Sequence, residues 1–255
     1  MPEILQRKYD NCMSKVLIIC PVYNEAHHLE ALINEFKQTD FIGDLLFVNS
    51  GSEDKSLSLI KNSKFSYISL EKNLGVGNAI VNGIDYGLKN TYEIICVIAG
   101  NGKMRPKYIN NLTQPIINDN YHFVQGSRYI DYKNHNMPFF RKLIIPLITK
   151  LFSILFNYQF SDATCGFRAF DIRLIKSCTF DIRAKWLKKY AFEPYFFSNV
   201  ILDKKVRKIE IPVTMDYPKK RMKYTKIKPF IDYPSLFFPY LYALVSPRKF
   251  KDLEY

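Results

Sequence analysis

Short apolar runs alternate with segments of helical spacing through the first half of the chain, and this alternation constrains the fold more than any other feature. Runs of strand length begin at Lys15, Asp44, Phe65 and Ile94. Between them, apolar residues recur at helical spacing, as they do across residues 26–39. The pattern repeats about every 20 to 25 residues, which is typical of βαβ units. The chain is therefore predicted to form an α/β fold around a mainly parallel sheet.

Turn-forming residues follow each predicted strand. They are Pro21–Glu25, Asn49–Asp54, Asn73–Gly77 and the run from Ala99 to Pro106. The carboxyl ends of parallel strands hold the ligand in open α/β sheets, so these turns are predicted to surround one site. Gly75 and Gly77 lack the third glycine and the acidic residue of a dinucleotide fingerprint. They indicate either close packing of the following helix or a contact with a diphosphate.

Charge and cysteine content limit the classes of partner. The net charge of +13 favours an anionic partner, such as phosphates, anionic lipid or nucleic acid. No nucleic-acid-binding module is recognised, so nucleic acid is not expected as the partner. The five cysteines show no CxxC pair and no metal-ligand spacing, and they are expected to be free thiols in a reducing compartment. Residues 1–12 carry charges throughout, so no signal peptide is expected there.

Two apolar segments of the second half are too short or too interrupted to span a membrane, which takes about 18 to 20 apolar residues. Residues 139–160 are apolar around most of a helix but contain Pro146 and Lys150. Residues 234–245 are apolar and aromatic, with basic residues on both sides. Both segments suit core helices as well. We favour helices that lie on an anionic membrane surface, because of the prolines, the aromatic ends and the basic flanks.

Six motifs resemble those of a known family. Those of the first half are Pro21-Val22-Tyr23-Asn24-Glu25, Asn49-Ser50-Gly51-Ser52-Glu53-Asp54 and Asn73-Leu74-Gly75-Val76-Gly77. They resemble the PxYNE, DDGSxD and NxGxG motifs of family 2 glycosyltransferases. Those of the second half are Gly126-Ser127-Arg128-Tyr129, Asp162-Ala163-Thr164-Cys165-Gly166-Phe167-Arg168 and Glu210-Ile211-Pro212-Val213. They resemble the polyprenyl-phosphate, or dolichol-phosphate, sugar transferases of that family.

The resemblance implies a GT-A fold, a Rossmann-like mixed and mainly parallel sheet flanked by helices. Residues 1–230 are expected to form this domain. Its nucleotide-sugar-binding half would be residues 15–130, and its acceptor half, residues 131–230, would include an interfacial helix at 139–160. Residues 231–255 are expected to be a C-terminal amphipathic segment that associates with the membrane.

The resemblance also implies a donor site in the first half. Glu25 corresponds to a nucleoside contact, Pro21 and Tyr23 to the walls of the pocket, and Gly75 to the donor-binding loop. The alternative for Glu25 is a cap on the following helix, whose positive dipole end suits a carboxylate. Ser50 stands in place of the second Asp of the family's DDGS, so recognition of the base is expected to differ.

The chain departs from the family at the end of the fourth strand. A DxD motif that binds Mg²⁺ or Mn²⁺ is usual there, but the aligned positions are Ala99, Gly100 and Asn101. A hard divalent cation prefers anionic oxygen ligands, so no metal cofactor is expected. Lys103, assisted by Arg105, is predicted to neutralise charge on the leaving diphosphate instead. The alternative is a catalytically inactive binder, which would not need the basic residues that continue through the acceptor half.

Four residues of the second half are predicted to act on the acceptor or the leaving group. Arg128 is placed at a strand end near the diphosphate, and Arg168 is expected to bind an acceptor phosphate through two hydrogen bonds. A structural ion pair between Arg168 and Asp162 is the alternative. If the acceptor is a sugar hydroxyl, a general base is required, and Asp162 and Glu193 are the candidates. With Lys103, the residues Arg128, Asp162 and Arg168 make up the predicted catalytic set.

A basic run at 217–226 stands where the family has its RxxGxSK loop, so Arg221 and Lys226 are expected to bind phosphate. The predicted function is transfer of a sugar from a nucleotide-sugar donor to a polyprenyl phosphate by a single inverting displacement. The expected location is the cytoplasmic face of a bacterial-type inner membrane, where the apolar surface equally suits a homo-oligomer. The alternatives are a capsule or lipopolysaccharide transferase acting on a sugar hydroxyl, and a non-catalytic nucleotide-binding scaffold.

Overall fold

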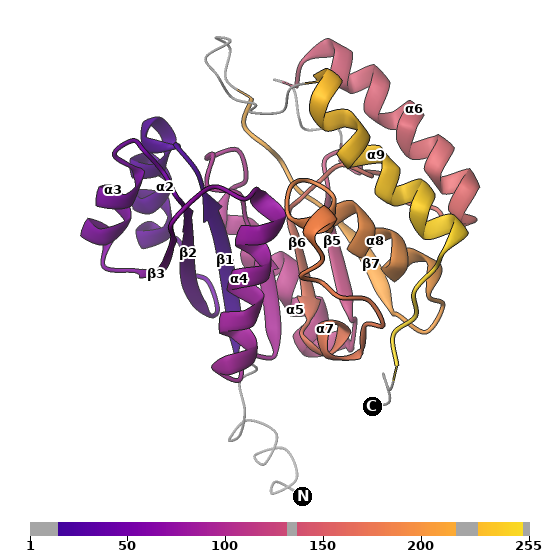
Figure 1. The fold of residues 1–255 in the computed structure, drawn as a ribbon, viewed down its shortest axis with the longest axis horizontal. Coiled ribbons are helices and arrows are strands. Elements are labelled where there is room, and N and C mark those ends of the chain that lie inside the picture. Colours follow the sequence, from indigo (N-terminus) through magenta and orange to yellow (C-terminus); the bar gives the residue numbers. More distant parts are fainter. Residues whose placement is uncertain (1–14, 132–136, 218–228, 252–255) are drawn as a thin grey trace, which may run out of the picture.

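The computed structural model describes residues 15–131, 137–217 and 229–251, whose arrangement is shown in Figure 1. The described residues form one sheet of strands in the order β3-β2-β1-β4-β6-β5-β7. The strands are β1 (Val16–Val22), β2 (Asp44–Ser50), β3 (Ser66–Leu70), β4 (Ile94–Val97), β5 (Phe123–Ser127), β6 (Arg168–Asp171) and β7 (Lys208–Pro212). All neighbours are parallel except those of β6, which confirms the predicted mixed, mainly parallel sheet.

Helices cover both faces of the sheet because successive strand residues point to opposite sides. In β1, Ile18 belongs to one buried cluster and Ile19 to the other. The Ile18 side is covered by α2 (Ala26–Gln38), α3 (Ser56–Ser63) and α5 (Ile109–Asp119). The Ile19 side is covered by α4 (Val76–Lys89), α7 (Arg173–Ser177) and α8 (Phe192–Leu202). Two short 3₁₀ turns, η1 (Pro106–Tyr108) and η2 (Lys185–Leu187), complete the connections between these elements.

A further helical layer lies over α8 and consists of α6 (Phe139–Phe156) and α9 (Pro229–Val245), side by side in Figure 1. Tyr240 of α9 stacks on Phe152 of α6 with ring centroids 4.3 Å apart, and its hydroxyl donates a hydrogen bond to the carbonyl of Ala163. The C-terminal segment is thus part of the packed domain, and the predicted boundary after residue 230 falls inside α9. Helix α6 ends before the predicted residue 160 because Asn157 turns to a left-handed φ of 49°.

None of the described helices is long and apolar enough to cross a membrane. The described cysteines are all free thiols, and Cys20, Cys96 and Cys165 are buried. Both results agree with the sequence-based predictions for these residues.

The antiparallel strand β6 determines which loops meet at the ligand edge of the sheet. It lies between β4 and β5, with Ala169 paired to Cys96 on one side and to Val124 on the other. Arg168, its first residue, is opposite Val97, the last residue of β4. The segment that precedes β6 therefore lies at the carboxyl end of β4. No strand was predicted here, because four residues with charged ends carry little periodicity.

Candidate active site

The loops after β1 and β2 are tied together by hydrogen bonds to side chains. The N–H of Glu25 donates to Ser56 Oγ at 2.9 Å, and the N–H of Ala26 donates to Asp54 Oδ2 at 3.0 Å. Asp54 therefore satisfies the first turn of α2, and the Glu25 side chain makes no capping hydrogen bond. The capping alternative for Glu25 is not what the structure shows. Asn24 permits the sharp turn through a left-handed φ of 50°.

The predicted donor-pocket residues occupy this pair of loops. Pro21, Tyr23 and Glu25 are half-buried, so each presents some surface at the carboxyl end of β1. Ser50, at the end of β2, is only 3% exposed, and its hydroxyl has no hydrogen-bond partner among the described residues. A buried hydroxyl without a partner carries a desolvation cost. The Ser50 hydroxyl is therefore a polar group beneath the loops that is free to hydrogen-bond to a ligand.

The turn after β4 is held by its own backbone and by a thioether. The N–H of Gly100 donates to the carbonyl of Pro21 at 3.1 Å, and the N–H of Ala99 donates to Met104 Sδ at 3.2 Å. Asn101 Oδ1 accepts the N–H of Lys103 at 3.2 Å. The turn is thus compact and in contact with the β1 loop. It is this turn after β4 that corresponds to the metal-binding motif of the family that the chain resembles.

The residues present do not fit a divalent cation at this turn. Ala99 and Gly100 have no side-chain oxygen, and the one amide oxygen, on Asn101, is already a hydrogen-bond acceptor. Within the described ranges no group of three or more His, Cys, Asp or Glu side chains is placed to hold a metal. The turn therefore lacks the anionic oxygen ligands that Mg²⁺ and Mn²⁺ prefer.

Lys103 is a half-buried cation among other charged groups. Its pKa is lowered to about 8, chiefly by burial and also by the positive charges of Arg141 and Arg128, which the negative charge of Glu25 partly offsets. These four side chains come from α6, the end of β5, the β1 loop and the β4 turn. Basic charge from several elements therefore acts at one place, next to the turn that replaces the metal motif.

Arg105 is committed elsewhere. Its guanidinium forms ion pairs with Glu35 at 2.9 Å and with Asp216 at 2.6 Å. The structure thus shows Arg105 bound to two carboxylates and not placed to assist Lys103 at the diphosphate, which was its predicted role. Asp216 also donates its N–H to the carbonyl of Lys103 at 3.0 Å. The β4 turn is thereby fastened to the chain that leads out of β7 toward residue 218.

The glycines that open α4 serve close packing. A Cβ on Gly75 would lie 2.6 Å from the carbonyl oxygen of Lys188, and a Cβ on Gly77 would overlap a carbonyl of the same segment. The N–H of Gly77 donates to the carbonyl of Lys189 at 2.8 Å, and that of Asn78 to Lys188 at 2.7 Å. The N-terminus of α4 is therefore occupied by backbone carbonyls. Of the two predicted roles, the structure shows packing, not a diphosphate site.

Arg128 and Asp162 form a buried ion pair. Arg128 Nε and Nη2 donate to the two Asp162 oxygens at 2.7 and 2.8 Å, and their side chains are 4% and 0% exposed. Arg128 also donates to Tyr217 Oη at 2.9 Å and to Thr164 Oγ1. Asp162 is thus fully engaged and turned away from solvent, which does not favour its predicted role as a general base. Arg128 acts on the site through its charge and by holding Tyr217.

Arg168 pairs with Glu193, not with Asp162. Its Nη groups donate to the carbonyls of Cys165 at 2.6 Å and Glu193 at 3.1 Å, and its Nε lies 3.8 Å from Glu193 Oε1. The Arg168 side chain is 5% exposed, so the predicted pair of hydrogen bonds to an acceptor phosphate would require it to leave these partners. Glu193 is 22% exposed, and burial raises the pKa of its carboxyl.

Tyr217 and Glu210 also organise the acceptor half, and the sequence did not predict these roles. Glu210 Oε2 accepts the N–H of Ser161 at 2.6 Å and so fixes the start of the loop before β6. In the sequence, Glu210 is the first residue of a recognised motif and Tyr217 the first residue of the basic run, and nothing else indicates their roles. Arg221 and Lys226 lie outside the described residues.

Residues 17–178 match glycosyl transferase family 2, a span of more than half the chain. The chain belongs to glycosyl transferase family 2. The match confirms the family that the motifs of this family 2 glycosyltransferase predicted.

Relatives and solved structures agree with this assignment. The chain is 29% identical over 192 residues to the UDP-N-acetylglucosamine–dolichyl-phosphate N-acetylglucosaminyltransferase of Methanococcus voltae, covering 67% of this chain and 74% of the relative. It is 24% identical to the undecaprenyl-phosphate mannosyltransferase of Micrococcus luteus, covering 78% and 83%. Glucosyl-3-phosphoglycerate synthase from Mycobacterium tuberculosis, solved with Mn²⁺ and UDP, superposes with a TM-score of 0.63 at 14% identity over 89% and 80%. The last likeness shows the shared fold of this family 2 glycosyltransferase.

Proposed function

We propose that this glycosyltransferase moves a sugar from a nucleotide-sugar donor to the phosphate of a polyprenyl phosphate at a membrane surface, without a metal at the β4 turn. The relatives named for dolichyl phosphate and undecaprenyl phosphate, which match most of the chain, support the acceptor class. The observation that carries the mechanism is the half-buried Lys103 beside a turn with no carboxylate.

A phosphate acceptor needs no general base. The second pKa of a phosphate monoester is about 6, so its attacking oxygen is ionised at neutral pH. Orientation and charge stabilisation then account for the rate, because the nucleophile is already formed. This suits a site in which the buried carboxylate of Asp162 is held by Arg128. One in-line displacement inverts the anomeric centre.

Fixed positive charge would stabilise the leaving diphosphate. The charges of Arg128 and Arg141 disfavour the protonated form of Lys103 in the free protein. A bound diphosphate would offset this repulsion and restore the full charge of the Lys103 ammonium. The chain thus provides through its own side chains the positive charge that a metal would supply at a DxD motif.

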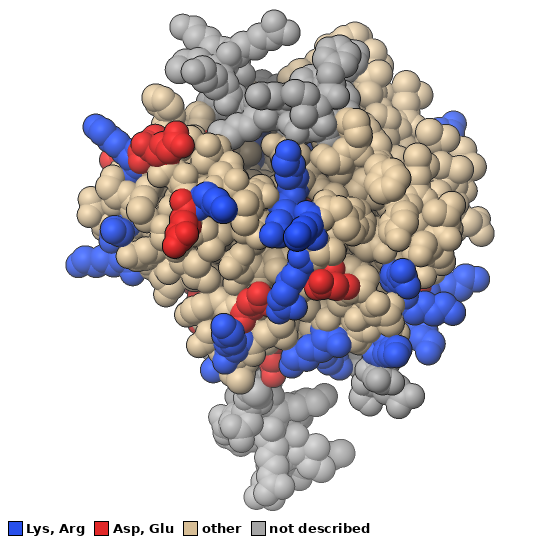
Figure 2. All heavy atoms as spheres, in the orientation of Figure 1, with Lys and Arg blue, Asp and Glu red and all other residues tan. Residues whose placement is uncertain are grey.

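The membrane surface would be formed by the exposed apolar side chains of α6 and α9. Those of α6 are Phe139, Leu143, Leu147, Leu151, Ile154 and Leu155, and those of α9 are Phe238, Leu241 and Val245. We call these nine residues the apolar face. Figure 2 shows few charged side chains over α6 and α9, while basic side chains gather lower on the same side of the molecule. An apolar strip with basic surroundings is suited to an anionic lipid surface.

A transfer assay tests the proposal. Purified protein, vesicles containing polyprenyl phosphate and a panel of UDP-, GDP- and CDP-sugars are incubated with Mg²⁺ or Mn²⁺ and, separately, with EDTA. Turnover that survives EDTA and falls about 100-fold or more in Lys103→Met supports the mechanism. Lys107→Met is the matched control, since Lys107 is exposed on the neighbouring η1 turn. Turnover abolished by EDTA would overturn the metal-free step.

Transfer to a sugar hydroxyl is the second candidate, and Glu193 is the observation in its favour. Its carboxyl lies close to Gly166, in the loop before β6, and its raised pKa suits a general base. In that case Glu193→Gln would abolish turnover, and removal of the polyprenyl phosphate would have no effect. Nucleotide binding without turnover on any acceptor would favour the scaffold.

A further inference from the structure

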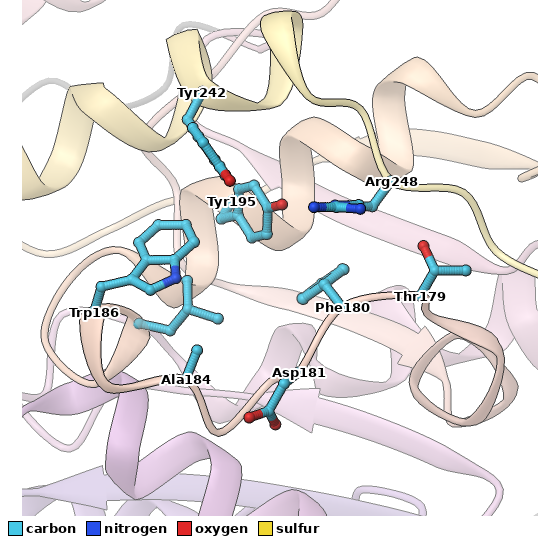
Figure 3. A pocket seen from close by; sticks show the side chains of 9 residues that line it. Thr179, Phe180, Asp181, Ala184, Trp186, Tyr195, Tyr242 and Arg248 are labelled. Atoms are coloured by element: carbon cyan, nitrogen blue, oxygen red, sulfur yellow. The ribbon is translucent and has the colours of Figure 1, made fainter.

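A pocket of about 260 Å³ lies outside the candidate active site, between the 179–187 loop, α8 and the C-terminal end of α9 (Figure 3). Its floor is buried or half-buried and includes Leu187 and Tyr195, and its rim is exposed and includes Asp181, Trp186 and Arg248. An apolar floor with a few polar groups at the rim is the usual anatomy of a small-molecule site. The loops after β1, β2 and β4 contribute nothing to its lining.

The rim carries one negative and one positive side chain, Asp181 and Arg248, and therefore favours neither net charge on a ligand. Arg248 points into the pocket toward the hydroxyl of Tyr195. Asp181 lies on the rim as well, where its Oδ1 accepts the N–H of Arg183 at 2.8 Å. A net charge on the ligand gains little, because an anion attracted by Arg248 is repelled by Asp181, and a cation attracted by Asp181 is repelled by Arg248. A neutral ligand with both donors and acceptors can bond to both.

The aromatic rings favour a ring that presents one apolar face. Trp186 meets Tyr195 at 68° with centroids 4.8 Å apart, and it meets Tyr242 at 77° and 5.5 Å. These steep angles leave no parallel pair of rings between which a flat base could be sandwiched. A pyranose instead places one C–H face on a single ring and turns its hydroxyls toward polar neighbours. Trp186 is 42% exposed, so part of its indole is available for such a contact.

The volume sets the size of the ligand. Small-molecule sites typically range upward from about 300 Å³, so a pocket of 260 Å³ holds one ring, not a complete nucleotide sugar. From the size, the opposed charges and the aromatic rim, we infer that this pocket is a binding site for a single neutral sugar residue, separate from the donor site. The hydroxyl of Thr179 and the indole N–H of Trp186 add to its hydrogen-bonding groups.

The single tryptophan of the chain makes this site directly observable. Because Trp186 is the only tryptophan in the sequence, intrinsic emission reports on the pocket alone. The full chain is titrated with methyl glucoside, methyl mannoside and N-acetylglucosamine, and with uridine and inorganic phosphate as non-sugar probes. Saturation-transfer NMR of each sugar gives a second readout, in case binding leaves the emission unchanged.

We expect at least one sugar to bind saturably, and Asp181→Asn and Arg248→Gln each to weaken it tenfold or more. Lys185→Gln, an exposed neighbour of Trp186 that does not line the pocket, is the matched control and should bind as the parent chain does. Lys103→Met should also retain sugar binding, which separates this site from the proposed donor site. Absence of sugar binding by both readouts would overturn the inference. Binding of phosphate or uridine alone, or sugar binding unchanged in both pocket variants, would overturn it too.

Discussion

Lys103 is a half-buried amine whose protonation opposes folding and would favour the binding of a diphosphate. Its pKa is lowered from an ordinary 10.5 to about 8 in the folded chain, chiefly by burial. Between these values the unfolded chain binds a proton that the folded chain does not. The free energy of unfolding therefore rises with pH across this window. A bound diphosphate acts in the opposite direction, because its negative charge raises the pKa of the amine.

The first prediction concerns proton uptake. At pH 8.5 about half or more of the Lys103 amines are neutral, so binding of a nucleoside diphosphate should take up protons. Calorimetric titration in two buffers of different ionisation enthalpy measures this uptake. It should disappear in Lys103→Met and persist in Lys107→Met. Equal uptake in both variants would show that another group is responsible.

The second prediction concerns Tyr217, which holds a buried guanidinium. Tyr217→Phe removes the acceptor of Arg128 Nη1 and leaves a buried donor without that partner. The free energy of unfolding should fall by about 1–3 kcal/mol. Urea unfolding measures the change, with Tyr67→Phe as control, because Tyr67 lies on β3 and is 42% exposed. A loss no larger than that of the control would contradict the role given to the hydroxyl.

At the scale of elements, the contact between α4 and the 187–189 segment depends on glycine. Gly77→Ala should destabilise the chain by about 1–3 kcal/mol, the usual cost of overpacking. Gly102→Ala is the informative control: Gly102 has a φ of +70°, but a Cβ there would meet His28 only at ordinary contact distances, 3.4 Å from its Cβ and 3.9 Å from its carbonyl oxygen. The control thus measures backbone strain without the clash. A melting temperature of Gly77→Ala equal to that of the unaltered chain would argue against close packing as the reason for Gly77.

The elements that could be predicted are those with a local pattern. The first four strands, and the helices that follow the first three of them, were predicted because each strand is a buried apolar run and helical spacing follows it. Strand β6 and helix α8 could not be predicted. The first is too short to show a period, and the second is buried nearly all round, so its sequence shows no polar face. Their positions depend on tertiary pairing with β4, β5 and α9.

The fourth prediction concerns helices α6 and α9. We expect the chain to bind anionic vesicles through the apolar face of these two helices. Leu147 and Ile154 are 64% and 68% exposed, so Leu147→Gln and Ile154→Gln remove apolar surface that is mostly exposed, without adding a positive charge that anionic lipid would attract. The pair of changes should lower partitioning onto vesicles of phosphatidylglycerol at least fivefold, with the thermal midpoint little changed. Sedimentation measures the bound fraction. Tyr67→Gln, the same kind of change on β3, should bind normally. If the apolar face pairs with a second copy of the chain, the two α6 variants would instead lose the dimer.

At the scale of the whole molecule, the donor and acceptor halves share one sheet. The pairing of β4 with β6 and the Arg128–Asp162 ion pair both cross from one half to the other. We therefore expect a single cooperative transition in urea, with coincident midpoints for Trp186 emission and far-UV circular dichroism. Two separate midpoints would show that the halves unfold independently.

The candidate site was predictable only in part at this scale. Motif positions placed Pro21, Tyr23 and Glu25 at one edge, since the carboxyl ends of neighbouring parallel strands must meet there. The partners of Arg128 and Arg168 were not predictable. They depend on the path of the chain back through β6, which brings Asp162 to one arginine and Glu193 to the other.

The position of β6 in the middle of the sheet also bears on the order in which the chain is made. Strand β4 is complete early in synthesis, yet one of its edges stays open until Arg168–Asp171 has emerged. All four residues of β4 are buried in the finished molecule, so a nascent chain exposes an apolar edge that is ready to pair with another strand. We therefore expect that this edge needs chaperones during translation, which keep it from pairing with strands of other chains.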